Sequence, residues 1–493
     1  MKIESTSPVP AKGASLDPEN WDAFRGVAHR MLDDILNHVM SIDQQPVWQP
    51  APEDARATMR ADLPREATGL DGVYDTFKQA VLPYGSGNLH PGFMGWVQGA
   101  GTPVGMLAEM LAAGMNPNLG GRDHMPIEVE RQILRWMREV FQFPETAGGL
   151  FLTGASQANF VALQIARTRA LGRDVRRTGL SAFPQLTGYG SAETHGCVMR
   201  AFEMSGLGGD AFRRIAPDAS GQIDIDALVA RIEADIASGH RPFLLVGSAG
   251  TVNTGAVDDL HALADVAARF RLHFHVDGAL GALAVLSESL APIMAGLERA
   301  DSIAFDFHKW GQVPYDAGYL IVRDEAWQKD TFASSAAYLT RADTGLAGGE
   351  WWPCDTGPDL SRGFRALKTW FTLKTCGLDG IGRSIAHSCA LARLLYERIR
   401  DEPSLRLLAP TRLNIVCFGY AGPDGRAPAE LNRQIVEALH LEGRVAPSLT
   451  LIDGVPAIRA CLVNHRTTAA DIDALIDHTL AIGDQLYLTG VPA

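Results

Sequence analysis

Short apolar segments alternate with longer amphipathic ones along residues 93–375 of this chain. The amphipathic segments carry apolar residues every three or four positions, as in 258–269, and this spacing predicts helices that cover a core. The apolar segments predict strands buried on both faces, at 149–152, 243–247, 272–276, 302–307 and 318–322. Buried strands separated by helices predict an α/β fold with a central, mostly parallel sheet.

The two ends of the chain differ from this central region. Residues 21–40 have helical apolar spacing, and the proline-rich stretch 44–65 predicts an irregular, extended arm. From residue 378 onward, helices are predicted at 381–400, 431–439 and 469–486, and strands at 414–418, 448–451 and 457–462. We therefore expect an N-terminal arm with helices that contact a second subunit (1–92), a large cofactor-binding domain (93–377) and a small C-terminal α+β domain (378–493).

The composition excludes several classes of protein. The chain has 493 residues, 46% hydrophobic positions and a net charge of −13, which is typical of a soluble enzyme and lacks the basic surface that nucleic-acid binding requires. No apolar run approaches the ~18 residues of a membrane span, and the N-terminus lacks a secretory pattern. The six cysteines lie far apart, so no disulfide framework is expected. We expect a cytoplasmic protein without nucleic-acid or membrane partners.

Two charged residues stand at the ends of predicted buried strands. Asp277 ends the strand that begins at Leu272, and Lys309 follows the strand Ser302–Phe307. Taken singly, such a lysine is most often a solvated charge, and such an aspartate is a turn or helix cap. In a mostly parallel sheet, however, ligands bind outside the carboxyl ends of the strands. Pyridoxal phosphate uses both groups, a lysine amine for a Schiff base and a carboxylate beside its ring nitrogen.

Two further positions fit this cofactor. Gly154-Ala155-Ser156 follows a predicted strand and opens a helix. Its backbone N–H groups and the Ser156 hydroxyl would cradle a phosphate, although Ser156 would serve equally as a helix cap. His195 opens another helix and offers a flat, ionisable ring that would stack on a cofactor and transfer protons, although an ordinary surface histidine is the commoner case.

His273 and His275 share a strand face with Asp277, because side chains alternate along a strand. The pattern His-x-His-x-Asp would suit a metal ion, but no third imidazole or cysteine lies at useful spacing nearby, so no metal is expected. We expect instead that one histidine forms a hydrogen bond near Asp277 and fixes the orientation of its carboxylate.

Taken in order, these motifs resemble the group II pyridoxal-phosphate-dependent amino-acid decarboxylases, which include the aromatic amino acid, histidine and glutamate decarboxylases. The resemblance runs from Trp21 onward and rests on Gly154-Ala155-Ser156, His195, Gly250-Thr251, His275-Val276-Asp277-Gly278-Ala279 and His308-Lys309-Trp310, with His90-Pro91-Gly92-Phe93 and Phe364-Arg365-Ala366-Leu367-Lys368-Thr369-Trp370 as further segments. It implies an aspartate-aminotransferase-like fold with a seven-stranded sheet, pyridoxal 5'-phosphate as cofactor, an L-amino acid substrate and a homodimer with shared active sites.

Carried over by position, the resemblance assigns roles to single residues. As catalytic residues, Lys309 would form the internal aldimine, Asp277 would pair with the pyridinium nitrogen and His195 would stack on the ring. The other cofactor contacts would come from Ala155, Ser156 and His308 around the phosphate, Thr251 near the ring substituents and Ala279 on the opposite ring face. The reaction implied is decarboxylation of the amino acid to its amine.

One loop departs from the family pattern. Many members carry a tyrosine on a mobile loop, ahead of the Phe-Arg-x-Leu-Lys segment, that is thought to donate the Cα proton. Here residues 346–358 contain Trp351 and Trp352 but no tyrosine, and Tyr338 belongs to an earlier segment. Relatives that lack this tyrosine can divert to oxidative deamination. An aldehyde synthase, or another pyridoxal-phosphate lyase, is therefore the alternative to amine formation.

The expected substrate pocket departs as well. Aromatic decarboxylases line it with bulky rings and aliphatic side chains, whereas this chain keeps one aromatic residue, Trp96, and otherwise has Asn88, Val97, Asn118 and Gly120, followed by Arg122, Asp123 and His124. If these residues line a pocket rather than a solvated loop, the substrate is larger or more polar than phenylalanine. Residues 116–126 are expected to reach the neighbouring subunit's site.

Overall fold

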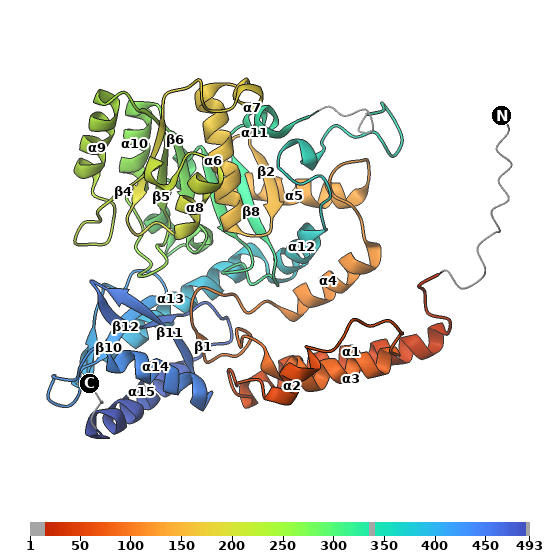
Figure 1. Cartoon of the computed structure of the whole chain (residues 1–493), viewed down its shortest axis with the longest axis vertical. Coiled ribbons are helices and arrows are strands. Elements are labelled where there is room, and N and C mark those ends of the chain that lie inside the picture. Colours follow the sequence, from red (N-terminus) through yellow and green to blue (C-terminus); the bar gives the residue numbers. More distant parts are fainter. Residues whose placement is uncertain (1–14, 335–340, 490–493) are drawn as a thin grey trace. The chain divides into compact units, whose positions relative to one another are not determined.

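The described residues of this computed structural model, 15–334 and 341–489, form two units. The first unit comprises 15–45 and 49–86 and is helical (Figure 1), with α1 (Trp21–Met40), α2 (Glu53–Thr58), α3 (Leu70–Ala80) and short 3-10 helices at Ile42–Gln44 and Leu82–Tyr84. The predicted helix at 21–40 is confirmed, and Asn20 caps it by accepting from the N–H groups of Asp22 and Ala23. The stretch predicted to be irregular contains one short helix, α2.

The second unit, 46–48 and 87–489, is built on a seven-stranded sheet. Its strand order is β2 (Gly148–Leu152), β8 (Gly318–Val322), β7 (Ser302–Asp306), β6 (His273–Asp277), β5 (Arg241–Ser248), β3 (Leu186–Ser191) and β4 (Phe212–Ile215). β8 is antiparallel to both of its neighbours, and the other adjacent pairs are parallel. This arrangement confirms the predicted mostly parallel sheet.

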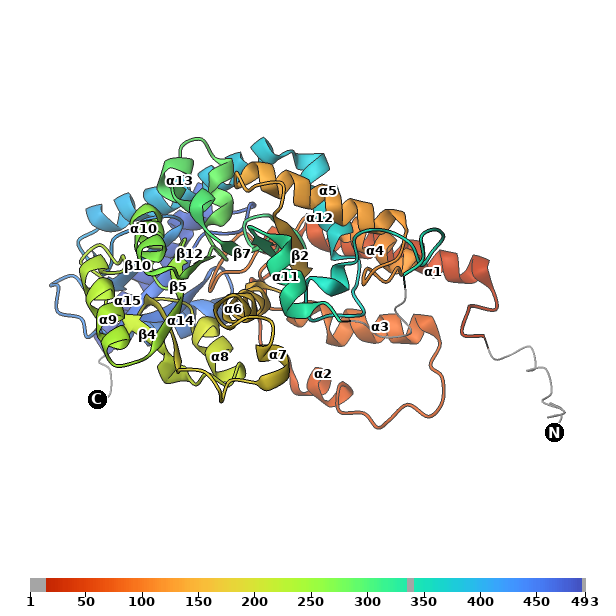
Figure 2. The same ribbon diagram turned by 90° about the horizontal axis from the view of Figure 1, so that it is seen from above.

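Helices cover both faces of the large sheet. Side chains alternate along β5, so Leu244 and Val246 pack with α6 (Ala155–Leu171) and α8 (Gly196–Met204), while Leu245 belongs to the larger core on the other face. Figure 2 shows α6 and α8 on one side of the sheet, and α10 (Leu260–Phe270) and α13 (Leu378–Asp401) on the other. The helices here are α4 (Pro103–Met115), α5 (Met125–Val140), α6 (Ala155–Leu171), α7 (Val175–Thr178), α8 (Gly196–Met204), α9 (Ile225–Ala237), α10 (Leu260–Phe270), α11 (Glu325–Phe332) and α12 (Arg365–Cys376).

A second, five-stranded sheet follows in the C-terminal part of this unit. Its order is β1 (Phe93–Met94), β11 (Ala446–Ile452), β12 (Val455–Cys461), β10 (Ile415–Tyr420) and β9 (Leu405–Leu407). A separate apolar cluster joins it to α13 (Leu378–Asp401), α14 (Leu431–Glu442) and α15 (Ala469–Thr489) (Figure 1). The division into domains at 92/93 and 377/378 stays a prediction. Among the described helices, none is long and apolar enough to cross a membrane.

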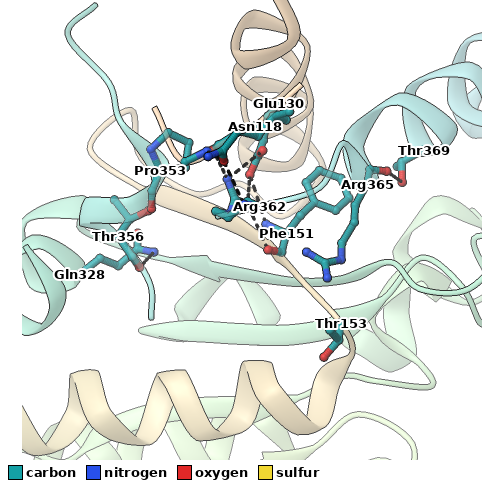
Figure 3. Close-up of polar contacts among 12 residues, drawn as sticks. Asn118, Glu130, Phe151, Thr153, Gln328, Pro353, Thr356, Arg362, Arg365 and Thr369 are labelled. Atoms are coloured by element: carbon teal, nitrogen blue, oxygen red, sulfur yellow. Dashed lines mark hydrogen bonds and ion pairs between the residues drawn. The ribbon is translucent and has the colours of Figure 1, made fainter. Parts of the chain in front are cut away.

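A buried ion pair joins segments of the second unit that are distant in sequence (Figure 3). The Arg362 guanidinium donates to both carboxylate oxygens of Glu130 in α5, at 3.1 and 2.6 Å, and both side chains are 1% exposed. Arg362 also donates to the carbonyl oxygens of Leu119 (3.0 Å) and of Phe151 in β2 (3.1 Å). Because a buried charge is stable only when it is paired and hydrogen-bonded, these contacts fix the segment that leads into α12.

Candidate active site

A cavity of about 620 Å³ opens at the carboxyl ends of the strands of the large sheet. Its volume is typical of small-molecule sites. Trp96 lines it, and so do all eight residues that the sequence predicts as cofactor contacts, namely Ala155, Ser156, His195, Thr251, Asp277, Ala279, His308 and Lys309. The fold therefore brings together motifs that are spread over more than 150 residues of sequence.

Lys309 lies just beyond β7, and its Nζ atom is 2.9 Å from Oδ2 of Asp306, the last residue of that strand. Burial by itself would lower the pKa of Lys309. The Asp306 carboxylate, with smaller effects of Asp277 and Tyr315, instead keeps this pKa above its ordinary value. The amine is therefore protonated at neutral pH. Sequence analysis assigned no role to Asp306, although a carboxylate inside a buried strand was the signal for one.

Asp306 also reaches the first turn of α6. The N–H of Ala155 donates to Oδ1 of Asp306 at 2.8 Å, so this carboxylate uses one donor of the predicted phosphate cradle. His308 accepts from the N–H of Ala317 through Nδ1 (3.0 Å), which leaves its proton on Nε2, 3.6 Å from Asp306 Oδ2. Burial lowers the pKa of His308, and the ring is neutral. Asp306 thus joins the lysine to the start of the helix.

Two glycines let the walls of the cavity come close together. A Cβ atom on Gly99 would lie 2.3 Å from the carbonyl oxygen of His308, so residues 96–98 approach Lys309 only because position 99 lacks a side chain. A Cβ atom on Gly318 of β8 would lie 2.3 Å from Cα of Gly154, at the turn before α6. Any larger residue at either position would push the cavity walls apart.

Asp277 ends β6, is 6% exposed and lines the cavity. Its Oδ1 accepts from the N–H of Ala279 at 3.2 Å, and its Oδ2 accepts from the side-chain amide of Asn159 at 3.2 Å. Nε2 of His275 lies 2.6 Å from Oδ1 of Asn159. The expected histidine contact is therefore made through Asn159 of α6, to which sequence analysis assigned no role.

The remaining predicted contacts are held by their own turns. His195 is the N-cap of α8, and its Nδ1 accepts from the N–H of Cys197 at 3.2 Å. The Thr251 hydroxyl lies 3.2 Å from that of Thr254 and accepts from the N–H of Ala256 at 3.1 Å. Both side chains are therefore fixed at the cavity wall by local hydrogen bonds.

Arg459 of β12 is a cavity residue that sequence analysis missed. It is 3% exposed and donates to three carbonyl oxygens, those of Val252 (2.6 Å), Asn253 (3.1 Å) and Trp96 (2.9 Å). It brings a positive charge to the cavity and joins β12 to two other segments of the cavity wall, one at Trp96 and one at 252–253. The signal was a single arginine inside an apolar predicted strand.

Comparison with known proteins agrees with this geometry. The conserved domain of pyridoxal-dependent decarboxylases matches residues 52–421. The chain belongs to this decarboxylase family. It is 29% identical to an aromatic-L-amino-acid decarboxylase of Bacillus atrophaeus (95% of this chain, 97% of the relative) and 30% identical to an L-2,4-diaminobutyrate decarboxylase of Rhizobium meliloti strain 1021 (86% and 83%). The crystal structure of Oryza sativa TDC with PLP and tryptamine superposes with a TM-score of 0.87 at 24% identity, over 95% of this chain and 99% of that one.

These findings confirm the aspartate-aminotransferase-like fold and identify this decarboxylase as a pyridoxal-phosphate-dependent carboxy-lyase. The residues present fit the cofactor. The cavity holds a lysine amine, an aspartate carboxylate and a helix N-terminus, which suit an aldehyde carbon, a ring nitrogen and a phosphate respectively. His273 and His275 have both ring nitrogens engaged in hydrogen bonds, which leaves no lone pair for a metal ion.

Three residues predicted for the substrate pocket do not line this decarboxylase's cavity within one chain. The side-chain oxygen of Asn118 accepts from the N–H groups of Gly120 (2.9 Å) and Arg362 (3.0 Å), and Figure 3 shows it beside the buried ion pair. The Arg122 guanidinium lies over the ring of Trp352, 4.4 Å from its centroid, and Nε2 of His124 lies 3.2 Å from the Asn118 carbonyl oxygen. Their approach to a neighbouring subunit's site stays a prediction.

The loop at 346–358 folds onto itself. The Trp352 indole donates to the carbonyl oxygen of Gly348 at 3.0 Å, and both Trp351 and Trp352 are buried. Neither tryptophan lines the described cavity. Tyr338, which sequence analysis assigned to an earlier segment, lies outside the described residues.

Asp306→Asn should make cofactor attachment faster at neutral pH. The carboxylate holds the pKa of Lys309 above its ordinary value, and only the neutral amine attacks the cofactor aldehyde, so removing the charge raises the reactive fraction. The measurement is the rate at which the visible band appears after cofactor is added, taken at a series of pH values. The pH at which this rate reaches half of its maximum should be lower in the variant. Asp316→Asn is the control, because that carboxylate pairs with Arg365 instead (2.9 Å). An unshifted Asp306→Asn profile would refute this role.

Proposed function

We propose that this carboxy-lyase decarboxylates an L-amino acid to the amine, with Lys309, Asp277 and His195 as its catalytic residues. The observation that supports this most strongly is the meeting of Lys309 and Asp277 in one cavity, at the carboxyl ends of the adjacent parallel strands β7 and β6. An amine and a carboxylate in the same cavity match the two demands that pyridoxal phosphate makes on a protein.

Pyridoxal phosphate, when bound, supplies an electron sink for the bond that loses carbon dioxide. Lys309 contributes the amine that holds it and Asp277 contributes the negative charge for its ring nitrogen. His195 contributes a flat ring whose Nδ1 accepts from the N–H of Cys197, which leaves Nε2 as the N–H donor. We assign the further cofactor contacts to Ala155, Ser156, Thr251, Ala279 and His308, and contact with the substrate to Trp96 in the same chain and to Asn118, Arg122 and His124 in the neighbouring subunit.

Tyr315 supports amine formation over aldehyde formation. Its ring centroid lies 4.3 Å from that of His308, and it lines the cavity. Burial raises the pKa of its phenol, so the group is protonated at neutral pH and can donate a proton. The loop at 346–358 has no tyrosine, and this remains the observation that favours an aldehyde synthase as the second candidate.

Product analysis decides between the two reactions. Purified protein with pyridoxal phosphate, screened against the twenty amino acids, should release carbon dioxide and an amine without using oxygen. Tyr315→Phe should lower amine formation by about 10²-fold or more, as for loss of a general acid, and divert product to the aldehyde. Aldehyde, ammonia and peroxide from the unaltered enzyme would overturn amine formation and establish an aldehyde synthase.

Exposed apolar side chains support a homodimer. In the helical N-terminal unit, Trp21 is 58% and Val73 is 53% exposed. In α4, Met110 is 54% and Met115 is 60% exposed. Large apolar side chains exposed repeatedly along one helix, as Met110 and Met115 are in α4, are typical of surfaces that another protein covers. We assign the partner as a second copy, and the location as a reducing cytoplasm, since none of the six cysteines is paired with another.

A further inference from the structure

A line of buried hydrogen bonds leads from α6 across β6 and β7. It starts at Arg169, whose Nη1 atom lies 2.7 Å from Nδ1 of His273. Nε2 of His273 lies 2.8 Å from the Ser302 hydroxyl, and that hydroxyl lies 2.8 Å from Nδ1 of His275. His273 and His275 lie on β6, and Ser302 lies on the adjacent strand β7. All three are at most 3% exposed, whereas Arg169 of α6 is about one-third exposed.

The same line continues to the cavity. Nε2 of His275 lies 2.6 Å from Oδ1 of Asn159, and Nδ2 of Asn159 lies 3.2 Å from Oδ2 of Asp277. Five consecutive hydrogen bonds therefore join Arg169, which is about one-third exposed, to the carboxylate that faces the cofactor site. None of the intermediate side chains lines the cavity.

The chemistry of the two end groups, Arg169 and Asp277, fixes which partner donates in each hydrogen bond of this line. A carboxylate accepts hydrogen bonds, so the Asn159 amide must donate to Asp277 and its oxygen must accept from Nε2–H of His275. Nδ1 of His275 then carries no proton, and the Ser302 hydroxyl must donate to it. Ser302 in turn accepts from Nε2–H of His273, whose bare Nδ1 accepts from Arg169.

Arg169 excludes the reverse direction. In a reversed line His273 would carry its proton on Nδ1 and would need an acceptor there. The Arg169 guanidinium has donors only, and the Asp301 carboxylate, which pairs with Arg169 at 3.1 Å, lies 4.0 Å from Nδ1, beyond hydrogen-bond distance. Burial lowers the pKa of His273 to about 4 and that of His275 to about 3. Both rings therefore stay neutral near neutral pH, and neither becomes a double donor that would break the line.

We propose that Arg169, His273, Ser302, His275 and Asn159 are positioning residues that orient one donor onto Asp277 and so set the charge that faces the cofactor's ring nitrogen. This inference rests on the proposed function, in which Asp277 pairs with that nitrogen. Aligned hydrogen bonds in a dry interior polarise one another, so the arginine's charge is felt at the carboxylate through the line.

The other ionisable groups that face Asp277 are few. Lys309 approaches from the end of β7, and Cys197 of α8 lies 3.3 Å from the Asn159 amide nitrogen. Burial, with a smaller effect of Asp277, raises the pKa of Cys197 to about 12, so its thiol is uncharged. Changes in the titration of the bound cofactor can therefore be read as changes in Asp277 and its hydrogen bonds, provided that Lys309 is unaltered.

Ser302→Ala cuts the line without touching the cavity. We expect its dissociation constant for pyridoxal phosphate to rise about tenfold, which corresponds to about 1.4 kcal/mol. We also expect the visible band of the bound cofactor to titrate at higher pH, because a less positive ring withdraws less electron density from the conjugated lysine nitrogen. Ser302→Thr keeps the hydroxyl and should restore both values. Thr187→Val is the matched control, since it removes another fully buried strand hydroxyl of the same sheet.

A second pair of variants tests the far end of the line. Arg169→Lys keeps a positively charged, donor-only group and should behave like the unaltered chain, whereas Arg169→Gln removes the positive charge from the end of the line and should shift the band in the same direction as Ser302→Ala does. If Ser302→Ala or Arg169→Gln folds, binds cofactor and titrates like the unaltered chain, the inference is overturned. If the unaltered chain itself binds no cofactor, the proposed function fails instead.

Discussion

Lys309→Ala should abolish the visible band of the bound cofactor and lower decarboxylation by more than about 10³-fold, as expected when the nucleophile of a covalent mechanism is lost. Lys309 is the lysine whose Nζ atom lines the cavity with Asp277 and Asp306. The measurement is borohydride reduction of the loaded protein followed by mass spectrometry of its peptides, with carbon dioxide release measured in parallel.

Lys309→Arg separates the covalent role of this residue from its charge. An arginine can still pair with Asp306 but does not form the covalent bond, so stability should be kept while the reducible band is lost. Lys329→Ala is the control for unspecific reaction of the cofactor, because Lys329 is half-exposed on α11 and pairs with Glu325. Reduced cofactor found on a peptide other than the one that contains residue 309 would refute the assignment.

The central strands of the large sheet could be predicted because both of their faces are buried. The apolar runs at 243–247, 272–276, 302–307 and 318–322 correspond to β5, β6, β7 and β8 within a few residues. β4 was not predicted, because it is an edge strand whose Arg213 and Arg214 interrupt the apolar pattern. β1 and β9 are too short for a periodic signal, with two and three residues. Hydropathy thus identifies strands whose buried side chains are apolar, whereas β3 is buried throughout but consists largely of Thr, Gly and Ser and gives no apolar run.

That the residues proposed for the cofactor site share one cavity could be predicted for a different reason. Lys309, Asp277 and His195 each stand at an element boundary. In a mostly parallel sheet, ligands bind outside the carboxyl ends of the strands, so a polar residue at such a boundary is a candidate for a site. Asn159 and Arg459 lie inside elements, and Asp306 lies inside the predicted strand 302–307, so the role of each depends on which neighbours the fold provides. A buried polar residue inside an apolar segment is the general signal for such partners, and it identifies the residue without identifying its contact.

The buried pair of Arg362 and Glu130 gives the largest expected effect on stability. Arg362→Leu leaves the Glu130 carboxylate buried with no cation, and such a change costs about 3–5 kcal/mol. The shift of the thermal unfolding midpoint, together with the rate of limited proteolysis, measures it. Arg433→Leu is the matched control, because Arg433 pairs with Glu430 on an exposed surface and its loss should cost at most about 1 kcal/mol.

The double variant Glu130→Leu with Arg362→Leu tests the cause. If the cost comes from an unpaired buried charge, removing both charges should recover part of the stability that either single change loses, since desolvating the pair is itself costly. Equal losses in the single and double variants would show instead that the other hydrogen bonds dominate. In those bonds Arg362 donates to the carbonyl oxygens of Leu119, which follows Asn118 in the sequence, and of Phe151. In that case the role of Arg362 is to fix the loop at 116–126, and its replacement should weaken association of the proposed dimer before it unfolds the chain.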